Sequence, residues 1–129
     1  MFVVDASVIA PVVADGGPDG DAFRARLRGQ TIAGPDLLRV EVISVIRRFT
    51  LGGLLTVAQA GRAIDDLIDL PIEVHASAPL LRRCWALRSN VTAYDACYVA
   101  LAEGLGCPLL TADVRLANAP GTRCRIELL

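Results

Sequence analysis

Four acidic residues of this sequence occupy positions from which carboxylates could act together on one substrate. Asp5 ends the apolar run FVVD, and Asp113 directly follows the apolar run PLLTA. Asp95 lies near the start of the apolar stretch 93–105, and Glu41 lies among valines and isoleucine. Carboxylates that converge in one crevice repel one another, and a hard cation such as Mg²⁺ or Mn²⁺ relieves that repulsion. The chemistry that such a site supports is metal-assisted hydrolysis of a phosphodiester.

Each acid also has a purely local explanation. Thr92 and Asp95 have the spacing of a capping box, in which the acid bonds back to the first residue of the helix. Asp5 and Asp113 could bond the first amides of the helices that follow them. Glu41 could pair with an arginine of its own helix. Capping explains each acid separately, but several acids at one place would still require a cation.

The elements that would position these acids follow from short apolar runs that alternate with helical patterns. Strands are expected at 2–5, 31–34, 72–76 and 108–111, with 123–128 as a candidate fifth strand. Helices are expected at 6–16, 19–29, 36–51, 57–69, 77–90, 92–105 and 112–118. This alternation predicts an α/β fold with a mainly parallel central sheet of four to five short strands flanked by helices. Parallel sheets bind ligands at the carboxyl ends of their strands, so Asp5 and Asp113 are expected to meet there.

Length and composition favour one domain spanning residues 1–129, with 53% hydrophobic residues to build its core. The longest uncharged runs, such as 6–14 and 104–112, are far shorter than the roughly 18 residues of a membrane-spanning helix. The N-terminus lacks the basic segment of a signal peptide, so we expect a cytoplasmic protein without a membrane partner. The net charge of −1 excludes a generic polyanion binder.

Histidine and cysteine usage argues against a zinc site. The only histidine is His75, in an expected strand, where a structural role is the simpler interpretation. The four cysteines contain no C-x-x-C spacing and are Cys84, Cys97, Cys107 and Cys124. Free cysteine packs readily in protein cores, so reduced and mostly buried thiols are expected.

Four segments in order resemble the PIN-domain ribonucleases, and more closely the VapC toxins of toxin–antitoxin pairs. The segments are DAS at 5–7, Glu41 within a helix, TAYDACYVALAE at 92–103 and LLTAD at 109–113. The resemblance covers essentially the whole chain. It implies a three-layer PIN fold, Mg²⁺- or Mn²⁺-dependent endoribonuclease activity, a homodimer and a cognate VapB-type antitoxin. In the family, the C-terminal segment of the antitoxin lies across the active-site groove.

The same resemblance assigns roles to individual residues. The catalytic and metal-binding quartet is Asp5, Glu41, Asp95 and Asp113. Of these, Asp5 and Asp95 are expected to contact the metal most directly. The hydroxyl positions that would orient the carboxylates or a coordinated water are Ser7, Thr92 and Thr111. Hydrolysis by an activated water would leave a 5′-phosphate on the RNA product.

Arginines are the candidates for contact with RNA phosphates, because the planar guanidinium matches phosphate oxygens. All 13 basic residues are arginine, a composition that also follows from a GC-rich genome. Arg88 and Arg115 are the first candidates because they are near Asp95 and Asp113 in sequence, and Arg82 and Arg83 come second. Exposed arginines commonly belong to a solvated helix face or an ion pair, which is the competing interpretation.

Aromatic and apolar residues have two interpretations as well. Trp85, Tyr94 and Tyr98 could stack on RNA bases, although helical spacing favours packing in the core. The apolar faces of helices 36–51 and 57–69 could bind a second copy of the chain or the antitoxin.

Other α/β classes fit less well. A receiver domain needs a lysine beside its aspartates, and this chain has none. A nucleotide-binding module needs a glycine pattern that the sequence lacks, and a haloacid-dehalogenase phosphatase needs a second aspartate where Ser7 stands. The remaining alternative is a PIN module that binds RNA or regulates without cleaving it.

Overall fold

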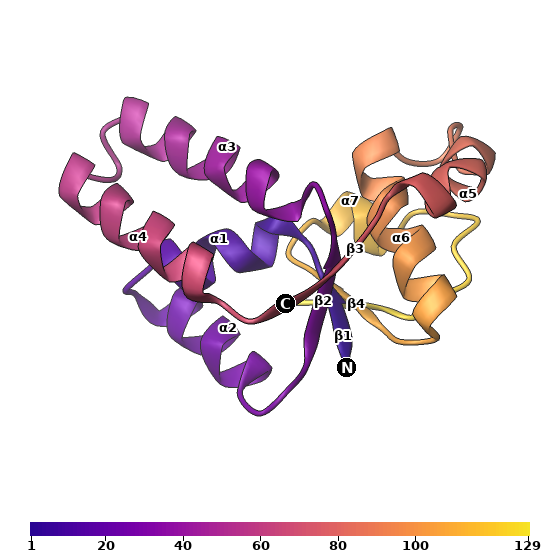
Figure 1. Cartoon of the computed structure of the whole chain (residues 1–129), viewed down its shortest axis with the longest axis horizontal. Coiled ribbons are helices and arrows are strands. Elements are labelled where there is room, and N and C mark those ends of the chain that lie inside the picture. Colours follow the sequence, from indigo (N-terminus) through magenta and orange to yellow (C-terminus); the bar gives the residue numbers. More distant parts are fainter.

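The computed structural model describes residues 1–129 and places a five-stranded parallel sheet between two groups of helices (Figure 1). The strands are β1 (Phe2–Val4), β2 (Ile32–Pro35), β3 (Ile72–His75), β4 (Leu109–Thr111) and β5 (Ile126–Leu128). Their order across the sheet is β3-β2-β1-β4-β5, and every neighbouring pair is parallel. The predicted three-layer α/β architecture is therefore confirmed, and the candidate strand near the C-terminus is the fifth strand.

The helices form two layers, with α1 to α4 on one side of the sheet and α5 and α6 on the other (Figure 1). The helices are α1 (Ala6–Ala14), α2 (Pro18–Leu27), α3 (Leu38–Leu51), α4 (Val57–Asp69), α5 (Leu81–Ala86), α6 (Ala93–Leu105) and α7 (Val114–Ala117). None of them combines the length and the apolar character that crossing a bilayer requires.

The helix predicted over residues 77–90 is longer than the helix in the structure. The chain forms a 3₁₀ turn at Ala78–Leu80, then the six-residue α5, and leaves helical geometry after Ala86. Residues 88–90 are exposed and polar, so no apolar contact favours extending the helix. The amides of residues 90 and 91 instead bond the carbonyl of Leu87, which turns the chain toward α6.

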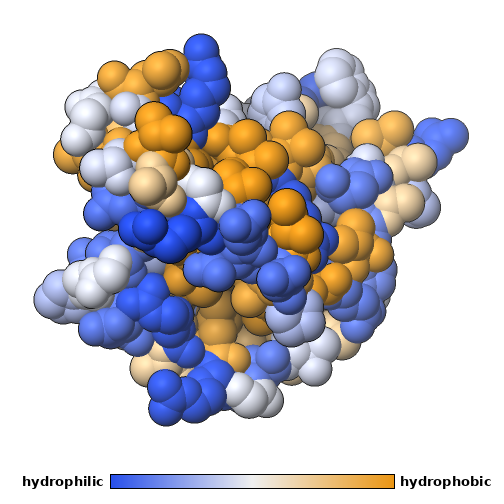
Figure 2. All heavy atoms as spheres, turned by 60° about the vertical axis from the view of Figure 1, so that its left-hand side comes forward, coloured by the Kyte–Doolittle hydropathy of each residue, from blue (hydrophilic) through white to orange (hydrophobic).

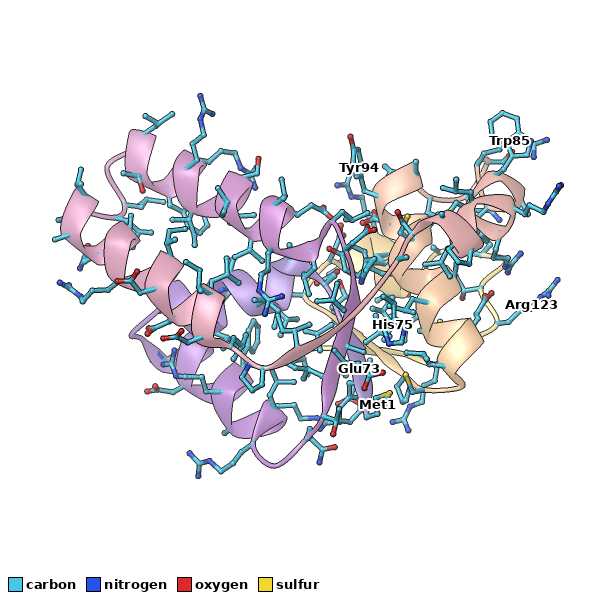
Figure 3. The ribbon with its side chains drawn as sticks, in the orientation of Figure 1. Met1, Glu73, His75, Trp85, Tyr94 and Arg123 are labelled. Carbon is cyan, nitrogen blue, oxygen red and sulfur yellow. The ribbon has the colours of Figure 1, made fainter.

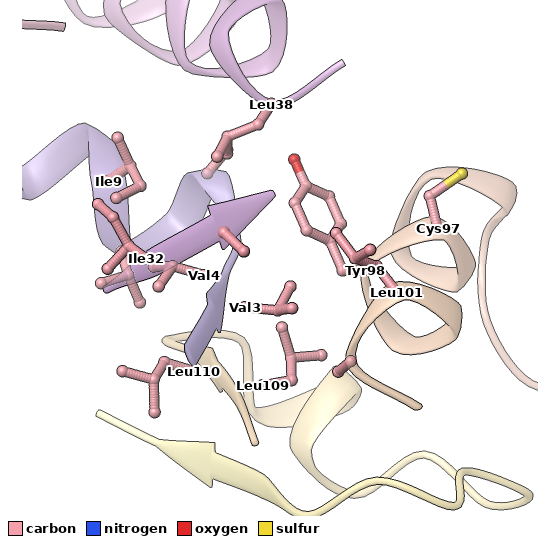
Figure 4. Close-up of a cluster of buried hydrophobic side chains, with 14 of the residues drawn as sticks. Val3, Val4, Ile9, Ile32, Leu38, Cys97, Tyr98, Leu101, Leu109 and Leu110 are labelled. Carbon is pink, nitrogen blue, oxygen red and sulfur yellow. The ribbon is translucent and has the colours of Figure 1, made fainter. Parts of the chain in front are cut away.

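The core is a cluster of 26 buried apolar residues on both faces of the sheet. The central strands are fully buried, with Val3, Val4, Leu109 and Leu110 all without exposed surface (Figure 4). A strand covered on both faces must be apolar throughout, which explains the unbroken FVV and LLT runs. Polar groups can follow only where these strands end.

Strands β1 and β4 are neighbours, and this pairing sets up the candidate site. Val4 is opposite Leu110 in the ladder, and Asp5 donates its amide to the Leu110 carbonyl at 3.3 Å. Asp5 and Thr111 therefore leave the sheet side by side at the carboxyl edge. The N-terminus of α1 and the start of α7 begin at the same edge.

Candidate active site

The Asp5 carboxylate is the centre of a network of hydroxyl and amide donors. Its Oδ1 accepts the Ser7 amide at 3.0 Å and the Ser7 hydroxyl at 2.5 Å, and its Oδ2 accepts the Thr111 hydroxyl at 2.5 Å. Because each hydroxyl gives its only proton to Asp5, its oxygen is left as an acceptor. Ser7 Oγ accepts the Ala112 amide at 2.8 Å, and Thr111 Oγ1 accepts the Asp113 amide at 3.0 Å.

This network fixes a nearly inaccessible carboxylate. Asp5 is only 5% exposed, yet every buried polar side-chain atom of the protein has a hydrogen-bond partner. The network also joins the end of β1 to the end of β4. Of the three predicted hydroxyl positions, Ser7 and Thr111 thus contact the Asp5 carboxylate directly.

Glu41 lies in the first turn of α3 and is half-buried. Its Oε1 accepts the Tyr98 hydroxyl at 2.7 Å, a contact between α3 and α6. The expected pairing with an arginine of its own helix is wrong, because Arg39 donates to two backbone carbonyls at the end of α4. The Tyr98 ring is 1% exposed and lies between α6 and the sheet (Figure 4).

Asp95 and Asp113 lie on a cleft of about 440 Å³ that Arg88 and Arg115 also line. The Thr92 hydroxyl accepts the Asp95 amide at 3.2 Å, so Thr92 caps α6. The reciprocal bond of a capping box, from the Thr92 amide to the Asp95 carboxylate, is absent. Asp113 caps α7, because its Oδ1 accepts the Arg115 amide at 2.8 Å.

The pKa values of three carboxyl groups reveal that the quartet shares one electrostatic environment. Burial is the largest cause of the raised pKa of Asp5, Glu41 and Asp95. The charge of Asp95 raises the pKa of both Asp5 and Glu41 further, and the charge of Asp113 raises that of Asp95. Hydroxyl donors limit each rise, as does Arg115 near Asp95. The fold therefore brings all four acids together.

The donor set fits a hard divalent ion that keeps most of its waters. No three acidic, histidine or cysteine side chains are close enough to share one ion directly. Mg²⁺ nevertheless binds through one or two carboxylates and reaches others through water. The site supplies only oxygen donors, which favours Mg²⁺ or Mn²⁺ over zinc. A second cavity of about 370 Å³, lined by Glu41, Arg48 and Tyr94, flanks the acids on the α3 side.

The candidate arginines differ in their surroundings. Arg88 and Arg115 line the cleft with the acids, and Arg82 is exposed on α5. Arg83 points elsewhere, since it forms two hydrogen bonds to Glu103, at 2.7 and 3.0 Å, and a third to the Gly121 carbonyl. The candidates for RNA contact are therefore Arg82, Arg88 and Arg115.

Comparison with known proteins supports the predicted resemblance to the PIN-domain ribonucleases. The PIN domain family model matches residues 2–121. The chain is 39% identical to Ribonuclease VapC12 of Mycobacterium tuberculosis over 129 residues, covering 100% of this chain and 99% of the relative.

Two solved structures share the fold. The toxin VapC20 of Mycobacterium tuberculosis, described as cleaving the sarcin-ricin loop, superposes with a TM-score of 0.72 at 14% identity. The superposition covers 95% of this chain and 96% of the VapC20 chain. A chain of the Rickettsia felis VapBC2 complex with a promoter DNA fragment superposes with a TM-score of 0.69 at 13% identity, covering 98% and 97%. Sequence, fold and acidic quartet together place this chain in the PIN-domain family, among the VapC ribonucleases.

Proposed function

We propose that this chain is the toxin of a toxin–antitoxin pair and acts as a divalent-metal-dependent endoribonuclease. The observation that carries the proposal is the coupling of four carboxylates at the carboxyl edge of β1 and β4. Capping and burial account for the position of each acid, and a bound cation would offset the repulsion that the hydroxyl donors and Arg115 leave. Its full-length relatives are ribonucleases by name, which makes RNA the substrate that we propose.

Each of the four acidic residues has a separate role in the proposed hydrolysis. When bound, Mg²⁺ or Mn²⁺ would supply positive charge that makes water a better nucleophile and offsets charge on the phosphate. Asp5 and Asp95 would hold the ion, and Asp5 Oδ2 accepts only one hydrogen bond and keeps a lone pair for this role. Glu41 Oε1 is fixed by Tyr98, so its other oxygen could accept a proton from the attacking water. Asp113 would contribute through its Oδ2, because its Oδ1 serves as the cap of α7.

Arginines at the cleft position the RNA backbone. Arg88 forms no ion pair, and Arg115 approaches Asp113 only at 3.8 Å, so both guanidinium groups are available to phosphate oxygens. They also offset negative charge that develops at the cleaved phosphodiester. Arg82 would contact the strand farther from the acids.

Protein partners are expected on the outer face of α3 and α4. Figure 2, in which this side of the molecule comes forward, shows apolar side chains gathered on its upper part. The exposed large apolar residues of α3, α4 and the loop between them, apart from Val40 at the cavity beside Glu41, are Ile43, Leu51, Leu54, Val57 and Ile68. We propose that a VapB-type antitoxin and a second copy of this chain cover such surface. In this proposal residues 1–129 act as one domain in the cytoplasm, where the RNA substrate is found.

The decisive experiment is the cleavage of labelled RNA by the wild type and by Asp95→Asn, with and without Mg²⁺. Asp95→Asn is a better variant than Asp5→Asn, because Asp5 accepts three hydrogen bonds that hold β1 and β4 together. We expect the rate to fall about 100-fold or more without a lower melting temperature, and the wild-type products to carry a 5′-phosphate. Asp65→Asn, which removes an exposed acid of α4, is the matched control.

The same experiment tests the alternative of a non-cleaving RNA-binding module. RNA binding without cleavage by the wild type would favour that alternative. Full cleavage in the presence of EDTA would contradict the metal-dependent mechanism.

A further inference from the structure

The only tryptophan of the chain, Trp85, is held outside the core. It lies near the end of α5 with 69% of its surface exposed, and it projects away from the body of the protein (Figure 3). Tryptophan is highly buried on average in folded proteins, and exposed copies are enriched where a partner binds. Packing in the hydrophobic core therefore does not explain a tryptophan at this position.

Arg88 connects Trp85 to the cleft that holds the acids. Its guanidinium carbon lies 4.7 Å from the centre of the Trp85 ring, and its Nη1 donates to the Trp85 carbonyl at 3.1 Å. The same arginine lines the cleft together with Asp95 and Asp113. The cation–π contact covers one face of the indole and fixes the guanidinium at the edge of the cleft.

The charge of this region selects the class of partner. The segment 81–88 contains three arginines and no acid, and Glu103 neutralises only Arg83. Neither Arg82 nor Arg88 has a carboxylate partner. Unpaired positive charge beside an exposed aromatic ring is the combination that binds single-stranded nucleic acid, by phosphate contact and base stacking.

We propose that Trp85 and Arg88 form a stacking platform for an unpaired RNA base near the cleaved phosphodiester. An unstacked base packs on the free face of Trp85, while Arg88 contacts a phosphate between that base and the acidic quartet. Bases inside a duplex are stacked on one another and cannot use the platform. The substrate is therefore single-stranded or looped RNA at this point. This inference rests on the proposed ribonuclease function.

Fluorescence tests the platform directly, because Trp85 is the only tryptophan and its emission reports this site alone. A short RNA of mixed sequence is titrated into the Asp95→Asn protein, either single-stranded or annealed to its complement. We expect single-stranded RNA to quench the emission and the duplex to leave it unchanged. Bound RNA that does not alter the emission overturns the platform.

Substitutions measure what the stacking contributes to binding. Trp85→Ala should weaken binding of the single-stranded RNA about 5- to 100-fold, whereas Trp85→Phe should keep much of the affinity. Arg88→Lys keeps the charge and loses the planar group, so we expect an intermediate loss. Val74→Ala removes another exposed apolar side chain, 50% exposed on the edge strand β3, and should bind as the wild type does.

Parallel assays separate this inference from the proposed function. If the wild type cleaves RNA and Trp85→Ala has the same KM, the platform is wrong while the ribonuclease function stands. If Trp85→Ala changes only the sedimentation behaviour or antitoxin binding, Trp85 belongs to a protein interface and the platform is also wrong. If the wild type neither binds nor cleaves RNA, both proposals fail.

Discussion

The hydroxyl groups beside Asp5 illustrate how single atoms control this site. A carboxylate that is 5% exposed keeps its charge only if donors replace the lost water, and Ser7 and Thr111 supply two hydroxyl protons. Thr111 is itself fully buried, so no water molecule can replace its hydroxyl group as a donor to Asp5 without rearrangement of the surrounding residues. The threonine therefore contributes both to stability and to the orientation of Asp5.

We predict that Thr111→Val destabilises the protein by about 1–3 kcal/mol, because Asp5 Oδ2 and the Asp113 amide both lose their partner. Urea unfolding at neutral pH measures the change. Thr50→Val is the matched control, since the Thr50 hydroxyl bonds only the Ile46 carbonyl within α3. Equal stability of the two variants would remove the role that we assign to Thr111.

The contact between Tyr98 and Glu41 leads to a second prediction. Tyr98→Phe keeps the buried ring and removes the donor 2.7 Å from Glu41 Oε1. We expect RNA cleavage to slow by about 10-fold, because Glu41 loses the contact that orients it. The free energy of unfolding should also fall by about 1.5–3 kcal/mol, the contribution of a hydrogen bond to a charged group. Tyr94→Phe alters an exposed hydroxyl and should keep full activity. A fully active Tyr98→Phe enzyme would show that Glu41 needs no fixed orientation.

The acids and the hydroxyl groups beside Asp5 were predictable, but Tyr98, the hydrogen-bond partner of Glu41, was not. Asp5 and Asp113 follow apolar runs, so the rule that parallel strand ends share an edge locates both. Tyr98 is 57 positions from Glu41, and its apolar surroundings resemble those of any core tyrosine. Its position three residues after Asp95, on the same face of α6, was the only available signal.

At the scale of the elements, most of the fold could be read from short-range patterns. The central strands β1, β2 and β4 follow short, mostly apolar runs, whereas β3 and β5 also contain charged residues, and each helix but one has roughly its expected range. The helix predicted over 77–90 is too long because leucine, alanine and arginine all favour a helix, and propensity does not indicate where packing ends. After Ala86 the amides of Asn90 and Val91 bond the Leu87 carbonyl, and helix propensity does not predict this turn.

One side chain connects three of these elements. Glu103 of α6 accepts two bonds from Arg83 of α5 and the amide of Arg123 in the C-terminal segment. The bond from Arg83 is the main cause of the lowered pKa of Glu103. A carboxyl group whose pKa is lower in the folded chain stabilises it above the unfolded value of 4.5. That contribution disappears as the pH falls through the folded pKa.

We therefore predict that Glu103→Gln lowers the free energy of unfolding by about 1–3 kcal/mol at neutral pH. Because wild-type Glu103 becomes protonated in acid, the difference between the two proteins should shrink below pH 4.5. Urea unfolding across this range measures both effects. Asp65→Asn, which changes an exposed acid of α4 that forms no ion pair, is the control. A difference independent of pH would mean that Glu103 acts through packing alone.

For the whole molecule, the acidic site makes folding stability depend on protons and cations. The pKa values of Asp5, Glu41 and Asp95 are raised, chiefly by burial, so the folded chain binds protons more tightly than the unfolded chain. The free energy of unfolding then falls as the pH rises from the ordinary pKa values, 3.8 for aspartate and 4.5 for glutamate, through the raised pKa values of the folded chain. In the proposed function a divalent cation would reverse the loss, because it would bind the ionised carboxylates of the folded state only.

The metal-free protein should therefore melt about 3 to 6 °C higher near pH 5 than near pH 7.5. Added Mg²⁺ should raise the melting temperature more at the higher pH than at the lower one, where protons compete with the cation for the carboxylates. Asp95→Asn removes one of the repelling charges, so its metal-free form should lose part of the difference between the two pH values. Calorimetry in EDTA and in Mg²⁺ measures all four conditions. A metal-free protein whose melting temperature rises steadily between these pH values would show that folding does not raise the pKa values of these carboxyl groups.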